Sequence, residues 1–218
     1  AFFNRPDEFD SRMREWKSIV GDKPFLSTEL CINWGGYQVD SYRIALSMGQ
    51  LYPKNLTITD ASAICYCWTI LNTVQPSYGA TRSLFVVDKQ KGFIPQPSSN
   101  QLRVFGSFSR YVKKGMQRVG VEVESEDLLV SGYKGDSGKG TIVMLNRSLE
   151  PIEVEIDWRD VKFETIERSS PYENNTTEKY YNSQSIKVEP GELVTISNVG
   201  LNTLDKNSVK QKGFLSIF

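Results

Sequence analysis

The 218-residue sequence contains no histidine, and this absence removes several kinds of chemistry at once. Serine–histidine–aspartate and cysteine–histidine nucleophile schemes, histidine general bases and histidine-ligated zinc all need an imidazole. Catalysis by this chain would therefore rely on carboxylates, lysine, tyrosine or groups from a partner chain. We expect neither a metal ion nor a cofactor.

Cysteine is also scarce, with three residues and no spacing typical of a metal site. Cys65 and Cys67 lie two positions apart in an apolar segment, so a strand there would point both thiols the same way. We expect both to be inert core residues.

The sequence has no net charge and no long apolar run. The 26 Lys and Arg residues balance the 26 Asp and Glu residues, so no long-range field favours nucleic acid or an anionic membrane. The longest apolar runs are far too short to span a bilayer. We expect no nucleic-acid partner and no transmembrane segment.

Helical and strand patterns alternate in the first half of the chain. Apolar residues at helical spacing predict three helices, and apolar runs between them predict two buried strands. The helices are expected over residues 6–19, 39–51 and 98–112, and the strands over residues 23–30 and 61–71. This alternation is typical of βα units around a parallel sheet. Two such strands do not close a core, because a parallel sheet buries both faces.

Beyond Lys114 the pattern changes to short alternating runs separated by turn signals, which predicts an antiparallel β-sandwich. The expected strands are residues 117–123, 128–133, 140–146, 151–156, 162–167, 185–188 and 193–197. We therefore predict part of a (β/α) barrel over residues 1–114, a β-sandwich over residues 115–202 and a tail over residues 203–218. The sequence begins without an initiator Met or a leader, so we expect a removed signal peptide or a fragment of a longer protein.

The first predicted strand, KPFLSTEL, ends beside a carboxylate, Glu29. In (β/α) barrels, catalytic groups project from the C-terminal ends of the strands. The loop that follows carries Trp34, and the next strand ends in Tyr66 and Trp68, which share a face opposite the cysteines. A carboxylate beside aromatic rings suits a sugar-processing site. From position alone, Glu29 could equally be a surface or capping group, and the tryptophans could be core or interface residues.

Four segments in a fixed order resemble the C-terminal part of a glycoside hydrolase family 30 enzyme: FLSTEL, ICYCWTILN, LRVFGSFSRYVKKGMQRVGVE and KGTIVMLNRS. This family includes glucosylceramidases, β-1,6-glucanases and glucuronoxylanases. The resemblance implies the end of a (β/α)8 TIM barrel followed by a β-sandwich, and a retaining β-glycosidase acting on β-linked glucosyl or xylosyl substrates. It also implies that Glu29 is the nucleophile and that Trp68 lines the sugar subsite, with Tyr66 and Trp34 as further candidates for the same wall.

The chain departs from the family pattern, because the Asn-Glu-Pro motif that carries the acid/base is absent. We expect the chain alone to be inactive and to need either the missing N-terminal part of the barrel or a second copy of itself. The substrate would be a carbohydrate or glycolipid, and the location secreted, periplasmic or cell-surface, or lysosomal in a eukaryote.

Two hypotheses outside catalysis stay open. The first is a non-catalytic carbohydrate-binding or structural β-sandwich module, for which the candidate aromatic residues are Tyr133, Tyr172, Tyr180 and Tyr181. The second is an interaction protein unrelated to sugars.

Overall fold

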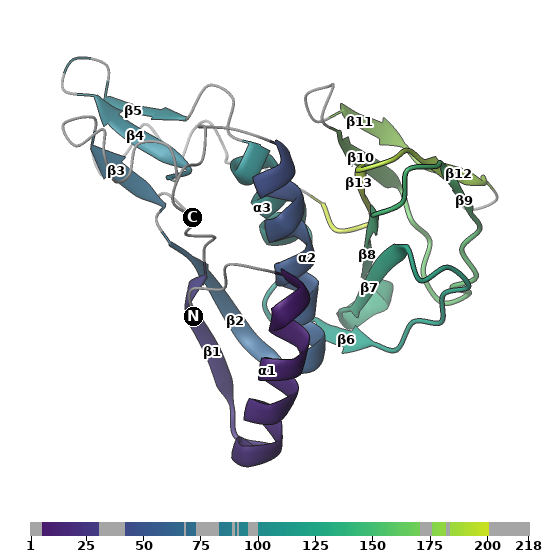
Figure 1. Cartoon of the computed structure of the whole chain (residues 1–218). Coiled ribbons are helices and arrows are strands. Elements are labelled where there is room, and N and C mark those ends of the chain that lie inside the picture. The colour runs from purple at the N-terminus through teal and green to yellow at the C-terminus, as the bar shows by residue number, and fades with distance from the viewer. Residues whose placement is uncertain are drawn as a thin grey trace.

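The computed structural model describes residues 6–30, 42–67, 69–72, 83–88, 90, 92–95, 100–170, 176–181 and 184–200. It is a mixed structure of helix and sheet, in which three helices lie between a parallel strand pair and an antiparallel sheet of six strands (Figure 1).

The first helix, α1 (Pro6–Val20), confirms the helix expected over residues 6–19. Proline is tolerated at a first helical position because its missing N–H would have no partner inside the helix. The helix ends at Gly21, which has a φ of 64° and donates its N–H to the Lys17 carbonyl at 2.9 Å. On the buried face, Trp16 packs against Phe25 with ring centroids 4.5 Å apart.

The two strands predicted for the first half are β1 (Phe25–Leu30) and β2 (Ala61–Tyr66), and they pair in parallel as expected. Helix α2 (Tyr42–Ile58) connects them and runs seven residues beyond the predicted end, through Pro53. Because Leu51 and Tyr52 are almost fully buried, tertiary packing sustains the helix across a residue that normally ends one.

A small three-stranded sheet follows, formed by β3 (Ile70–Asn72), β4 (Phe85–Asp88) and β5 (Gly92–Pro95). The prediction of one strand over residues 61–71 is wrong, because β2 ends at Tyr66 and β3 belongs to this other sheet. The β4–β5 hairpin was not predicted from the sequence. Helix α3 (Asn100–Ser109) then lies within the helix expected over residues 98–112.

The six-stranded sheet is antiparallel, with the strand order β11-β10-β13-β8-β7-β6. Strands β9 and β12 form a separate antiparallel pair, and a short 3-10 turn, η1 (Asp136–Gly138), joins β7 to β8. The bounds are β6 (Gln117–Val119), β7 (Leu128–Lys134), β8 (Gly140–Asn146), β9 (Ile152–Val154), β10 (Thr165–Ser169), β11 (Thr176–Lys179), β12 (Ile186–Val188) and β13 (Leu193–Ser197). The sequence predicted β8 and β13 at these bounds and missed β11, whose first residue it assigned to a turn.

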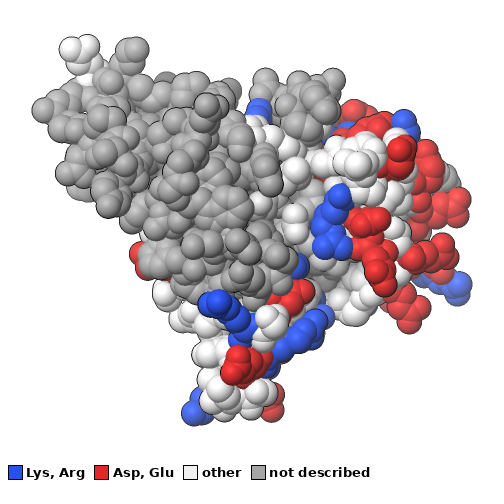
Figure 2. All heavy atoms as spheres, in the orientation of Figure 1, with Lys and Arg blue, Asp and Glu red and all other residues white. Residues whose placement is uncertain are grey.

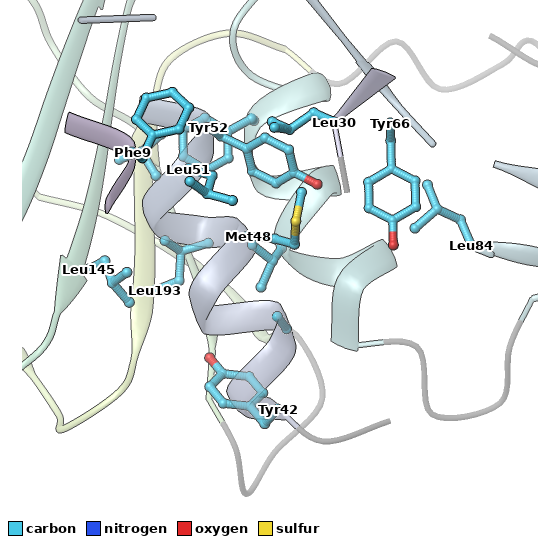
Figure 3. Packing of buried hydrophobic residues seen from close by; sticks show 14 of the residues in the cluster. Phe9, Leu30, Tyr42, Met48, Leu51, Tyr52, Tyr66, Leu84, Leu145 and Leu193 are labelled. Atoms are coloured by element: carbon cyan, nitrogen blue, oxygen red, sulfur yellow. The ribbon is translucent and has the colours of Figure 1, made fainter. Parts of the chain in front are cut away.

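Both faces of the sheet are covered. Helices α2 and α3 pack on one face, where a Cβ added to Gly49 would lie 3.3 Å from Val104 and 3.7 Å from Leu145. Figure 3 shows Leu145 and Leu193 in this cluster beside the residues of α2. The β9–β12 pair and the segment around Phe163 cover the other face. The first core thus includes residues from both sides of the boundary predicted at residue 114, and the boundary itself stays a prediction.

Acidic and basic side chains intermix over the antiparallel half of the molecule, with acidic groups more numerous on the face that Figure 2 shows. Among the described residues, that face has no broad basic surface of the kind that nucleic acid binding needs. Within the same part of the chain, no helix combines the length and the apolar character needed to cross a bilayer.

Candidate functional site

Glu29 lies at the second-to-last position of β1, and its side chain is exposed. The parallel register pairs Leu30 with Tyr66, and the Cys67 N–H extends the ladder by donating to the Leu30 carbonyl at 3.2 Å. The carboxyl ends of β1 and β2 therefore meet at Glu29 and Cys67. There the Cys67 thiol donates a hydrogen bond to Glu29 Oε1, with Sγ and Oε1 3.3 Å apart.

Among the other sequence-predicted site residues, the structure describes Tyr66 alone, and it lies in the core. Tyr66 is 9% exposed and packs against Phe105 of α3, with ring centroids 6.0 Å apart. Figure 3 shows its ring beside Leu84, within the helix-facing core. Its predicted place in a sugar-binding wall stays a prediction that this burial does not favour. Trp34 and Trp68 lie outside the described residues.

The expectation that both thiols are inert core residues is wrong for Cys65, which is exposed, whereas Cys67 is 6% exposed. Cys65 lies on the face of β2 that the helices leave uncovered, while Cys67 follows the end of the strand. The sequence analysis had placed both cysteines opposite the candidate site. The signal it missed was the parallel pairing, which brings the residue after β2 beside the carboxylate of β1.

The β1–β2 pair has one covered face and one open face. Phe25 and Leu30 pack toward the helices, while Leu26 is 57% exposed on the other side. An exposed leucine in the middle of a parallel strand is unusual, because parallel sheets are normally covered on both faces. The carboxylate of Glu29 is thus located at the end of a half-covered strand pair.

The described part of the chain contains no group of three or more Cys, Asp or Glu side chains that could hold a metal ion.

A second feature is a surface cleft of about 240 Å³ beside the core on that face of the six-stranded sheet which points away from the helices. Trp158, Phe163 and Tyr180 form a row of rings in it, with successive centroids 5.7 Å and 6.3 Å apart. Exposed charged side chains surround the rings, including the ion pair between Asp157 and Arg159 at 3.4 Å. The cleft is lined by Ile156, Asp157, Trp158, Arg159, Lys162, Phe163 and Tyr180.

The tyrosines considered for a carbohydrate-binding module differ in placement. Tyr133 is 2% exposed in the core, Tyr180 is 4% exposed at the base of the cleft, and Tyr181 is 66% exposed. Tyr172 lies outside the described residues. The cleft residue Trp158, which is half-buried, was not singled out by the sequence analysis.

No protein-family model matches the sequence, and no curated protein matches it either. Solved structures do share the fold. A conserved exported protein from Bacteroides fragilis has a TM-score of 0.67 at 16% identity, with 87% of this chain and 42% of that chain covered. A glycoside hydrolase family 30 subfamily 8 xylanase from Clostridium acetobutylicum has a TM-score of 0.61 at 17% identity, with 80% and 42% covered.

The catalytic domain of a family 30 xylanase from Talaromyces cellulolyticus has a TM-score of 0.63 at 14% identity, with 81% and 41% covered. These likenesses show a fold that glycoside hydrolases also have. The chain spans about two fifths of the length of these structures.

Proposed function

We propose that the chain is the C-terminal portion of a retaining β-glycosidase of the family 30 type, with Glu29 as the nucleophile. The observation that carries the proposal is the exposed Glu29 carboxylate at the carboxyl end of a parallel strand. This is where (β/α) barrels place catalytic groups. The fold shared with glycoside hydrolases supports the same function.

In the proposed reaction, a Glu29 oxygen attacks the anomeric carbon and the bond to the leaving oxygen breaks. A second carboxyl group gives its proton to that oxygen, and water then hydrolyses the glycosyl-enzyme. The two carboxyl groups must lie about 5–5.5 Å apart. The sequence lacks the Asn-Glu-Pro motif, so the second group would come from the rest of the parent protein, and the chain alone would be inactive.

The open face of the β1–β2 pair supports the fragment interpretation. In a complete barrel this face would point into the interior, where layers of side chains would cover Leu26 and Cys65. Among the described residues β1 pairs with β2 alone, and we propose that a further barrel strand pairs with its other edge. The missing barrel strands or a second copy of the chain would cover the open face of the β1–β2 pair and the other edge of β1.

The proposed substrate is a carbohydrate or glycolipid with a β-linked glucosyl or xylosyl unit. The xylanases described above favour this class, and the exported protein favours a secreted, periplasmic or cell-surface location, or a lysosomal one in a eukaryote. Trp68, Trp34 and Tyr66 stay candidates for the stacking wall.

Azide rescue tests the role of Glu29 in the parent protein expressed from its complete reading frame. Glu29→Ala should lose at least about 10³-fold in kcat on an aryl β-glycoside, since covalent catalysis is removed. Azide should restore turnover and give the α-glycosyl azide, because a small anion then attacks from the side that the carboxylate occupied. Glu124→Ala, at another exposed glutamate, is the control and should match the wild type. Wild-type activity in Glu29→Ala would contradict the proposal.

A second candidate function is carbohydrate binding without catalysis, which the aromatic cleft favours. A half-buried tryptophan flanked by Asp157 and Arg159 offers both an apolar ring and hydrogen-bonding groups to a sugar. Titration of the chain with soluble β-glucan and xylan oligosaccharides tests it. Binding that disappears in Trp158→Ala and persists in Tyr181→Ala would support this function, and the absence of binding to the wild type would exclude it.

A further inference from the structure

We propose that Cys67 is a positioning residue for Glu29, whose thiol holds the nucleophilic carboxylate in the orientation that attack requires. This inference rests on the proposed function, in which Glu29 reacts with the sugar. The thiol acts through Glu29 and does not react itself. The juxtaposition that carries it is the 3.3 Å distance between Cys67 Sγ and Glu29 Oε1.

Both partners of this hydrogen bond are anchored to the same strand ladder. Cys67 donates its backbone N–H to the Leu30 carbonyl at 3.2 Å, one residue beyond Glu29. Leu30 itself is fully buried and lies opposite Tyr66 in the parallel register. The backbone therefore fixes the positions from which the two side chains reach each other.

The two partners differ strongly in exposure, and this difference gives the bond its effect. Glu29 is exposed, and the terminal torsion of a glutamate is broad, so a hydrogen bond from a fixed donor restricts the orientation of its carboxylate plane. Cys67 is 6% exposed, so its thiol is held in place by packing. A thiol is a weak donor, but a hydrogen bond to an ionised carboxylate is stronger than one between neutral groups.

A fixed carboxylate matters for the first chemical step more than for binding. Nucleophilic attack requires the reacting atoms to be aligned before the bond forms, and misalignment lowers the rate. Removing the thiol should therefore lower kcat and leave KM nearly unchanged. Cys65 provides a matched comparison, because it is a thiol two residues away in the same segment and is exposed.

A spectroscopic measurement on the 218-residue chain tests the hydrogen bond without requiring activity. With Cys31 and Cys65 replaced by serine, the Raman S–H stretching band belongs to Cys67 alone. The band should lie at lower frequency in this protein than in the same protein carrying Glu29→Leu, because a hydrogen bond to a carboxylate weakens the S–H bond. The same band position in both proteins would overturn the inference.

Steady-state kinetics of the parent protein on an aryl β-glycoside tests the consequence. Cys67→Ala should lower kcat about tenfold, the size expected for one hydrogen bond to a charged group, with KM within about twofold. Cys67→Ser keeps a donor and should stay within about threefold of the wild type, and Cys65→Ala should match it.

Equal losses in Cys67→Ala and Cys67→Ser would indicate packing instead of positioning and would overturn the inference, as would wild-type kcat in Cys67→Ala. Failure of the proposed function would be recognised by a different result: Glu29→Gln would then keep wild-type activity.

Discussion

The antiparallel sheet and the parallel strand pair are buried in different ways. Every residue of β8 and β13 is buried, and Val194 and Ile196 have no exposed surface. In β1 only Ser27 and Leu30 are buried, and Leu26 is 57% exposed. The six-stranded sheet is covered on both faces, whereas among the described residues helices cover one face of the strand pair and Leu26 stays exposed on the other.

The difference follows from the sequences of the strands. Strand β8, GTIVMLN, is a nearly continuous apolar run, which is typical of a strand covered on both faces. Strand β1, FLSTEL, is more polar and places a carboxylate near its end. A strand of this composition tolerates one solvent-exposed face, as the 57% exposure of Leu26 shows.

The largest expected effect is a cavity in the six-stranded sheet. Ile196→Ala should lower the free energy of unfolding by about 3 kcal/mol, because it removes fully buried methyl groups between β13 and the β9–β12 cover. Urea unfolding followed by circular dichroism measures it. A loss below about 1 kcal/mol would show that this face is less tightly packed than the structure indicates.

The next effect concerns the carboxylate that joins the helices to the sheet. Glu167 in β10 is 1% exposed in its side chain and accepts hydrogen bonds from Arg110 and, at 2.8 Å, from the Tyr111 hydroxyl. Arg110→Ala should destabilise the chain by about 2 kcal/mol, because the buried Glu167 carboxylate loses its positively charged partner. The loss is smaller than for a fully buried ion pair, since Arg110 is partly exposed.

Arg159→Ala is the matched control for Arg110→Ala, since Arg159 forms an ion pair with Asp157 in which both side chains are largely exposed. Its effect on the free energy of unfolding should stay within about 0.5 kcal/mol. Equal effects of the two substitutions would mean that the buried carboxylate does not tie the helices to the sheet.

The next effect, confined to alkali, is a loss of stability. Burial raises the pKa of Tyr133 from 10.0 to about 12. Between these values the unfolded chain releases the proton and the native chain keeps it, so stability is complete below about pH 10 and falls as the pH rises toward 12, by at most about 1.4 kcal/mol per pH unit. Tyr133→Phe should flatten this fall, measured by urea unfolding at several pH values. Tyr181→Phe, at an exposed tyrosine, should leave it unchanged.

The smallest effect is expected on the open face of β1. Leu26→Ser should change the free energy of unfolding of the isolated chain by less than about 0.5 kcal/mol, because most of the side chain is already in water. In the parent protein the same substitution should cost more, since Leu26 would be buried there. Equal small effects in both proteins would contradict a complete barrel around β1.

The sequence correctly predicted those elements whose apolar pattern matches the way they are buried in the fold. Strands β8 and β13, helix α1 and the parallel pairing of β1 with β2 followed from periodicity and order. The predicted end of α2 was wrong, because burial of Leu51 and Tyr52 outweighs the local effect of Pro53. Strand β11 was missed because all four of its residues are exposed, which leaves no alternating apolar pattern to find.

At the candidate site, the position of Glu29 followed from the strand end, but its surroundings did not. The sequence analysis named Tyr66 for the site, which stays a prediction, and it expected Cys67 in the core, where it is 6% exposed. It did not foresee that the Cys67 thiol also reaches Glu29. Only the register between the two strands decides which of them meets Glu29, and a single sequence does not contain that register. The same is true of Trp158, whose partners Phe163 and Tyr180 come together through the fold.

The most direct test of the central claim is to trap the glycosyl-enzyme. The parent protein is incubated with a dinitrophenyl 2-deoxy-2-fluoro-β-glycoside of glucose or xylose, digested and analysed by mass spectrometry. The leaving group needs no acid, and the fluorine slows hydrolysis of the intermediate. The account predicts one added fluorosugar on the peptide that contains Glu29, and none in Glu29→Gln. A fluorosugar attached to any other carboxylate, or an unmodified protein that still hydrolyses the parent glycoside, would contradict it.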